Sequence, residues 1–486
     1  MRKYFRFYRA TKNYLCICFF IILAIRMAIG CKKFVQVSAP VTSLNSGNVY
    51  SSDATAISVL NGVYDRASTG GYGSIQSITS CTFVAGLSAD ELSLYNNLNS
   101  QFLAYYINNL SPITAGYEIW NDVYPQIYIL NSAIEGLNSS TGTSLAVRNQ
   151  LLGEAKFMRA FYYFYLVNLY GDVPLVTTSN YIVNQALGKT PASQVYDQIV
   201  TDLEAAQSLL SGQYLDATLL NPTQDRTRPT RWAATALLAR TYLYLKNWKS
   251  ADSAASAVIS NSAEFTLSTL NDVFLKTSPE AIWQLQPVNS GQNTQDALLF
   301  ILPSTGPNTT TYPVYLDTSL VNSFEPGDQR RTQWVDSVSV SGTIYYYPYK
   351  YKINELNAAV NEYTMVLRLG EQYLIRAEAE TQLTGMASAQ AISDIDTIRN
   401  RAGLPNYSGL TDMVDFLNEI YHERRIELFV EWGNRWLDLK RTGMVDSVMT
   451  LATKIKGGNW STYQQLYPLP ASDIKTDPNL TQNLGY

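Results

Sequence analysis

The sequence predicts a mainly α-helical protein with long irregular segments between its helices. Apolar residues recur at helical spacing through the middle of the chain and again toward its C-terminus. Segments with this pattern are Ile113 to Leu137, Leu145 to Tyr170, Pro191 to Leu210, Thr230 to Leu245, Trp248 to Ser260, Val366 to Leu383, Ala387 to Ala402 and Asp412 to Asp438. Polar stretches interrupt the pattern, so we expect a helical scaffold that carries long loops.

Small and large residues alternate in the stretch RWAATALLARTYLYLKNWKSADSAASAVI. Alanines such as Ala239 and Ala251 let one helix approach another, while Trp248 fills the neighbouring gap, as in tetratricopeptide hairpins. A second copy, VLRLGEQYLIRAEAETQLTGMASAQAISDI, places Ala377 and Ala389 where the first has Ala239 and Ala251. The repeat predicts a tetratricopeptide-like helical-pair scaffold.

Two irregular stretches differ from the helices in composition. Asn45 to Asn109 and Asn261 to Glu362 are rich in Ser, Thr, Asn, Gly and Tyr. Within the second stretch, AIWQLQPV and TIYYYPYKY have the residue types of short β-strands. Long irregular insertions in a compact scaffold are uncommon unless they are functional or disordered, so we expect recognition to occur here.

The N-terminus has the features of a secretory signal. A basic region is followed by an apolar run from Leu15 to Ile25, which is shorter than the roughly 20 residues needed to span a bilayer. Small residues then lead into Cys31, a pattern that favours acylation of this cysteine over a plain secretory signal. The sequence therefore predicts a signal peptide over residues 1–30 and a lipidated tether over residues 31–48.

Composition excludes several classes of function. Removing the signal, which holds six basic and no acidic residues, leaves 30 basic against 40 acidic residues, a balance that argues against nucleic acid as a partner. His422 is the only histidine, and Ile426 stands where a zincin motif needs its second histidine. Cys81 is the only thiol outside the signal and Cys31, so no intrachain disulfide is expected. We predict no metal site and no cofactor.

Two C-terminal segments are the most specific part of the chain. These are HERRIELFVEWGNRWLDLKRTG, from His422 to Gly443, and YPLPASDIKTDPNLTQNLGY, from Tyr467 to Tyr486. The first places opposite charges three or four residues apart among large apolar residues, as on neighbouring helical turns. Arg435, Trp436 and Asp438 could resemble a binding site, but we interpret them as part of a network that stabilises the fold.

Both segments, together with the block from Gly153 to Val176 and the block from Val366 to Leu404, resemble the SusD/RagB family of nutrient-binding outer-membrane lipoproteins. The resemblance implies a single SusD-like domain over residues 49–486. Its helical scaffold would cover about 113–260 and 363–442, with loop-rich ligand-binding insertions at about 49–110 and 261–362. It also implies a cell-surface location, a SusC-type TonB-dependent barrel as partner and delivery of a bound nutrient to that barrel, with the lipid anchor as the only membrane attachment.

Sugar recognition needs flat rings against C–H faces and polar side chains for the hydroxyl groups. Most of the 35 tyrosines should fill helix interfaces, so the best candidates lie outside the helical pattern. The expected rings are Tyr72, Tyr95, Tyr312 and Tyr315, and the expected hydroxyl partners are Asp90, Asn293, Gln295 and Asn308.

Three classes of function remain open. Glycan binding is the hypothesis that explains the signal and the signature blocks together, and peptide or protein-fragment binding of the RagB type is its alternative. A glycoside hydrolase would need two carboxylates across a cleft. The candidate carboxylate pairs are Asp90 with Glu91 and Glu378 with Glu380. The first pair are sequence neighbours and the second lies in the scaffold, so we predict no catalytic residues. A scaffold that binds only proteins is the third class.

Overall fold

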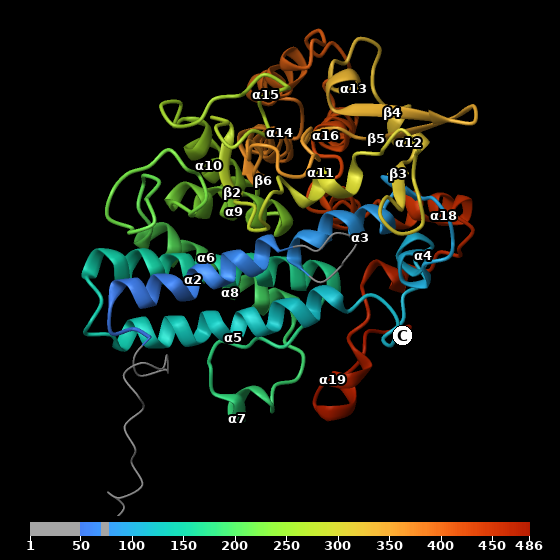
Figure 1. The fold of residues 1–486 in the computed structure, drawn as a ribbon. Coiled ribbons are helices and arrows are strands. Elements are labelled where there is room, and N and C mark those ends of the chain that lie inside the picture. The colour runs from blue at the N-terminus through green and yellow to red at the C-terminus, as the bar shows by residue number, and fades with distance from the viewer. Residues whose placement is uncertain (1–48, 70–76) are drawn as a thin grey trace, which may run out of the picture. The chain divides into compact units, whose positions relative to one another are not determined.

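Helices packed one against the next form the scaffold of the computed structural model, which describes residues 49–69 and 77–486 (Figure 1). The helices are α2 (Asp53–Ser68), η2 (Ile78–Ser80), α3 (Cys81–Ser88), α4 (Ser100–Tyr106), α5 (Glu118–Ser139), α6 (Leu145–Tyr170), α7 (Tyr181–Asn184), α8 (Ala192–Leu209), α9 (Arg231–Tyr244), α10 (Trp248–Ile259), α11 (Gln295–Phe300), α12 (Thr318–Val321), α13 (Arg330–Gln333), α14 (Leu369–Thr384), α15 (Ala389–Arg401), α16 (Met413–Glu427), α17 (Asn434–Arg441), α18 (Val445–Ile455), η3 (Thr462–Gln465) and α19 (Ala471–Thr476). The signal peptide, Cys31, the tether over 31–48 and Tyr72 lie outside the described residues.

The strands form three small antiparallel sheets. They are β1 (Leu92–Leu94), β2 (Ala281–Leu285), β3 (Val314–Leu316), β4 (Val335–Val340), β5 (Thr343–Pro348) and β6 (Thr364–Arg368), paired as β1 with β3, β2 with β6 and β4 with β5. Every residue of β2 and β6 is buried, so this pair ties the 261–362 insertion to the scaffold. The two β-prone pieces of the sequence correspond to β2 and β5.

Helix α6 lies at the centre of the packing because it is apolar on nearly all sides. It packs against α5, α8 and α9, and its residues from Phe157 to Val167 are all buried. Gly153 allows the chain after α8 to approach, since a Cβ there would lie 2.7 Å from Cγ of Leu210. The following helices continue the stack from α9 through α10 to α14 and α15.

The alanines of the predicted hairpin lie in a close helix interface, as expected. Ala239 of α9 and Ala251 of α10 are fully buried in one cluster with Ile375 and Ala379 of α14. Small side chains on both sides of the contact let the three helix backbones approach, and close packing makes such sites sensitive to added volume.

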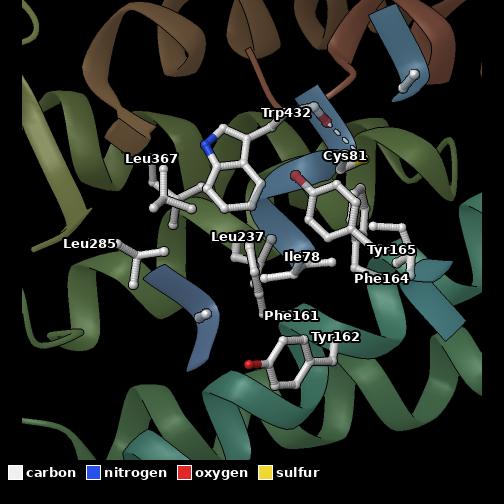
Figure 2. Packing of buried hydrophobic residues seen from close by; sticks show 14 of the residues in the cluster. Ile78, Cys81, Phe161, Tyr162, Phe164, Tyr165, Leu237, Leu285, Leu367 and Trp432 are labelled. Atoms are coloured by element: carbon white, nitrogen blue, oxygen red, sulfur yellow. Dashed lines mark hydrogen bonds between the residues drawn. The ribbon is translucent and has the colours of Figure 1, made fainter. Parts of the chain in front are cut away.

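The core joins the two ends of the chain around Trp432 (Figure 2). Its ring lies 5.5 Å from that of Phe161 and 5.8 Å from that of Tyr165, both in α6, measured between centroids. Its backbone carbonyl accepts a hydrogen bond from Sγ of Cys81 in α3 at 3.7 Å. The N-terminal helices therefore pack directly on the C-terminal signature segment.

The segment from Asp412 to Asp438, predicted as one helix, is broken between α16 and α17. Val430, Trp432 and Gly433 have left-handed φ values of 50°, 51° and 70°. Neighbouring side chains satisfy the freed backbone groups: Glu91 accepts from the Val430 amide at 3.0 Å, and Thr82 accepts from the Trp432 amide at 3.0 Å. Tertiary hydrogen bonds thus replace the helical bonds that the local pattern favours.

Three other predicted boundaries differ from the structure. Residues 364–368 form β6 because they pair with β2, so the helix expected from Val366 begins at Leu369. The helix expected from Ile113 begins at Glu118. The stretch 49–110, expected to be loop-rich, contains α2, α3 and α4. In α2 the apolar residues Ile57, Leu60 and Val63 face the core, and its many polar residues lie toward solvent, which hid the helix in the composition.

A buried ion network holds α16 in place. Oε1 of Glu427 accepts from Nη1 of Arg368 at 2.5 Å and also from Arg401, while Oε2 accepts from Nη1 of Arg330 at 3.1 Å. Burial alone would raise the pKa of Glu427, but the charges of these three arginines outweigh it and hold the pKa well below its ordinary value of 4.5. In α17, Asp438 binds Arg424 at 2.8 Å and Arg441 at 2.6 Å, so the predicted fold network is present.

We expect Ala239→Leu and Ala251→Leu each to destabilise the protein by about 1–3 kcal/mol, because added methylenes overpack the helix interface. The measurement is the free energy of thermal or denaturant unfolding. Ser253→Leu, on the exposed face of α10, is the matched control and should leave stability nearly unchanged. If both alanine variants unfold like wild type, the interface is not closely packed.

We expect Glu427→Gln to cost about 3–5 kcal/mol at neutral pH, because it leaves three buried arginines short of a negative charge. A group whose folded pKa is depressed contributes stability above its unfolded pKa and loses it as the pH falls through the folded value. The difference from wild type should therefore be full above about pH 4.5 and shrink at lower pH. Glu355→Gln, at an exposed position, controls for the loss of one charge. Equal stability of the two variants would contradict the role of the network.

Candidate functional site

Pairing of β1 with β3 brings together two loops that lie more than 200 residues apart in the sequence. Ser93 stands opposite Tyr315, and the Tyr95 amide donates to the carbonyl of Pro313 at 2.8 Å just beyond the paired strands. Strand β5 packs against β3 on the same side of the molecule (Figure 1). Tyr315 of β3 and Tyr95, directly after β1, both predicted from the sequence, therefore lie at the same strand pair.

Three tyrosines in or next to these strands are in contact, and we term them the tyrosine cluster: Tyr95, Tyr315 and Tyr345. The Tyr345 ring lies 5.1 Å from the Tyr315 ring and 6.0 Å from the Tyr95 ring, at interplanar angles of 80° and 71°. Tyr95 is 41% exposed, and the other two are half-buried. Edge-to-face packing fixes the rings, and the partial exposure leaves apolar ring surface next to phenolic hydroxyls.

Ser93 links the tyrosine cluster to the adjacent charged residues. Its hydroxyl donates to Oδ2 of Asp317 at 3.0 Å, and Ser93 lies near the phenol groups of Tyr106 and Tyr315. Partial burial raises the pKa of both tyrosines, so they remain protonated donors at neutral pH. Protonated phenols, a serine and a carboxylate are suitable partners for a ligand rich in hydroxyl groups.

A pocket of about 390 Å³ adjoins the cluster through Asp317. Its charged walls are Asp90, Asp317, Arg425, Arg435 and Lys456, and its apolar wall is helix α18. Asp90 is held by Arg435 in a two-point contact, at 2.8 Å to Nε and 2.9 Å to Nη2, and by Arg425 at 2.9 Å. Although burial alone would raise the pKa of Asp90, these two arginines lower it, so the carboxylate stays ionised and engaged.

The neighbouring Glu91 behaves differently. It is fully buried, and burial raises its pKa to about 7 even though it accepts the Val430 amide. Lys456 donates to the carbonyls of Leu87 at 2.7 Å and of Ala89, and burial lowers its pKa to about 8. The two neighbouring carboxylates thus have different positions. Asp90 lines the pocket, and Glu91 supports the α16–α17 connection.

The other predicted residues have structural contacts of their own. Oδ1 of Asn308 accepts from the amides of Thr311 at 2.7 Å and Tyr312 at 3.2 Å, closing the turn that leads into β3. Asn293 is buried and accepts from the amides of Asn361 and Glu362 at 2.9 and 3.0 Å. Gln295 begins α11 and donates to Gln292 at 2.9 Å.

Asn308 therefore fixes the turn that contains the half-buried Tyr312. Asn293 ties the chain before α11 to the segment 359–362, and Gln295 contacts the turn before α11. Sequence reasoning missed Tyr345 and Tyr106. Tyr345 lies in the β-prone piece TIYYYPYKY, and period-two alternation could have marked its face. The packing of β5 against β3 is a long-range contact and has no local signal in the sequence.

Among the described residues, one group of three carboxylates has the spacing of a metal site. Glu325, Glu419 and Glu423 converge, but each accepts a hydrogen bond from Nη1 of Arg399, at 2.6, 2.8 and 3.1 Å. The guanidinium thus occupies the position of a cation. Within residues 49–69 and 77–486, no helix combines the length and apolar character needed to cross a bilayer.

Comparisons with known proteins agree with the fold. A family model described as starch-binding and associating with the outer membrane matches residues 46–243, and a model described as the SusD family matches residues 335–486. The chain is 27% identical over 434 residues to SusD-like protein P25 of Formosa agariphila, a match that covers 76% of this chain and 79% of that protein.

Two solved structures have the same architecture. A SusD superfamily protein from Parabacteroides distasonis is 25% identical with a TM-score of 0.73, covering 91% of this chain and 100% of that one. A laminarin-binding SusD-like protein is 23% identical with a TM-score of 0.73, covering 90% and 100%. The chain belongs to the SusD/RagB family, and its fold is the mainly α-helical SusD-like fold predicted from the sequence.

Proposed function

We propose that this protein is a cell-surface lipoprotein that binds glycan nutrients and delivers them to a SusC-type TonB-dependent barrel in the outer membrane. The observation that carries glycan binding is the tyrosine cluster, where three fixed rings lie beside Ser93 and Asp317. Exposed ring surface suits sugar C–H faces, and the adjoining polar groups suit hydroxyls. The family description as starch-binding supports the same class of ligand.

The ligand site comprises the tyrosine cluster with Tyr312, and the pocket beside Asp317 extends it. Asp90 orients Arg435 and Arg425 at the pocket wall rather than contacting hydroxyls freely, because its oxygens are already engaged. Tyr72 is a further candidate ring. Binding to a fixed site avoids the cost of ordering loops when the ligand arrives.

The remaining parts of the proposal come from the N-terminus and the family. Residues 1–30 are the signal peptide, Cys31 carries the lipid and residues 31–48 form the tether to one SusD-like domain. Ligand contacts shared with the barrel would favour a closed complex, because a ligand stabilises the state to which it binds more tightly.

Peptide binding is the alternative ligand class, since tyrosine rings also suit peptide side chains.

We expect Tyr315→Ala, Tyr95→Ala and Tyr312→Ala each to weaken glycan binding while the fold is retained. Loss of one ring contact should cost about 0.5–1.5 kcal/mol, or about two- to tenfold in Kd. Binding is measured by calorimetry with a ligand found on an array of glycans and peptides. Tyr128→Ala, which removes a ring that is 50% exposed on α5, is the matched control.

The same array separates the alternatives. Binding only to peptides would replace the glycan proposal with the RagB type, and wild-type affinity in every tyrosine variant would move the site elsewhere. Hydrolysis of a glycan at enzyme-like rates, abolished by one carboxylate substitution, would overturn the binding-protein proposal altogether.

We expect Cys31→Ala to shift the protein from the membrane fraction to the soluble fraction when it is produced without a barrel partner. Each buried CH₂ of an acyl chain contributes about 0.8 kcal/mol to membrane binding, and the variant has no acyl chains. Cys81→Ala, at a buried thiol in α3, should fractionate like wild type. Membrane retention of Cys31→Ala would contradict lipidation.

A further inference from the structure

Helix α7 presents three consecutive large apolar side chains to solvent. Tyr181, Ile182 and Val183 are 70%, 60% and 47% exposed, respectively. They lie in the connection between α6 and α8, which projects from α5 in Figure 1. Contiguous exposed apolar residues on a soluble domain usually mark an interaction surface.

The connection is held firmly, so the apolar residues are presented in a fixed position. Asn131 of α5 donates to the carbonyls of Val176 at 2.9 Å and Thr178 at 3.3 Å. Glu135, also in α5, accepts from the Thr178 hydroxyl at 2.8 Å and the Ser179 amide at 2.9 Å. On the other side, Lys189 donates to Asn483 at 2.5 Å.

Near the same end of α5 lies Tyr50, one of the first residues that the structure describes. The Tyr50 ring packs on Gly136, where a Cβ would lie 2.2 Å from it, and the Ser140 hydroxyl donates to the Tyr50 carbonyl at 2.7 Å. Gly136 directly follows Glu135, which holds the α7 connection. Tyr50, near the first residue that the structure describes, therefore contacts α5 within about one helical turn of the α7 attachment point.

We propose that α7 is a membrane-contacting tip that places Tyr181, Ile182 and Val183 in the outer leaflet beside the lipid anchor. This inference rests on the lipidation in the proposed function. Only residues 32–48 separate the acylated Cys31 from Val49, so even a weak insertion is sampled at high effective concentration. Ile182 and Val183 offer no hydrogen bonds to a sugar or a charged partner, and tyrosine favours the headgroup level of a bilayer.

The test places an environment-sensitive fluorophore on the tip of the full lipidated chain. Cys81 is buried and Cys31 is the acylation site, so Ile182→Cys provides a single reactive thiol for the NBD fluorophore. The protein is reconstituted in phosphatidylethanolamine and phosphatidylglycerol vesicles and isolated by flotation. Leu356→Cys, 66% exposed between β5 and β6, is the matched control.

The expected result is a blue shift of NBD emission at position 182 on vesicle binding, with slower reduction by external dithionite, and neither change at position 356. Floating protein whose label at 182 reacts as fast as the control would overturn the inference and leave the lipoprotein proposal intact. Protection that appears only after a barrel partner is added would assign the tip to the barrel and also overturn it. Failure of the protein to float with the vesicles would contradict lipidation and overturn both proposals.

Discussion

The buried carboxylate of Glu427 is the contact on which the C-terminal half of the structure depends. Its three arginine partners come from the end of β6, the start of α13 and the end of α15, so one side chain joins three segments to α16. Burying these charges is costly, and the structure offsets the cost with multiple hydrogen bonds to each group. The Trp334 ring packs against the network and makes cation–π contacts with Arg368, Arg401 and Lys350.

The network also reaches the candidate site. Lys350 donates to the carbonyls of Glu427 and Phe429, both at 2.9 Å, and so fixes the left-handed α16–α17 connection. Glu91 accepts a hydrogen bond from the Val430 amide of that connection, and Asp90 binds Arg435 of α17. Because Glu91 and Asp90 directly precede β1, the same contacts set the position of Tyr95. The fold network therefore also fixes the segment that leads into β1 and Tyr95.

This separation of roles explains the distribution of charge and aromatic rings in the molecule. Charges are concentrated where segments distant in the sequence must meet, because paired charges with fixed geometry are satisfied in only one arrangement. The rings of α6 fill the core, whereas Tyr95 after β1, Tyr315 of β3 and Tyr345 of β5 remain partly exposed.

The sequence by itself determined the family, the helical scaffold and the alanine interface, because signature segments, period-3.6 patterns and small-residue spacing are local properties. It also indicated Tyr95 and Tyr315 as exposed rings outside the helices. Only the tertiary structure decided that these rings meet Tyr345, that Asp90 is engaged by two arginines, and that the chain breaks after Glu427. Each of these features depends on contacts between residues far apart in the chain, where packing and hydrogen bonding outweigh local preference.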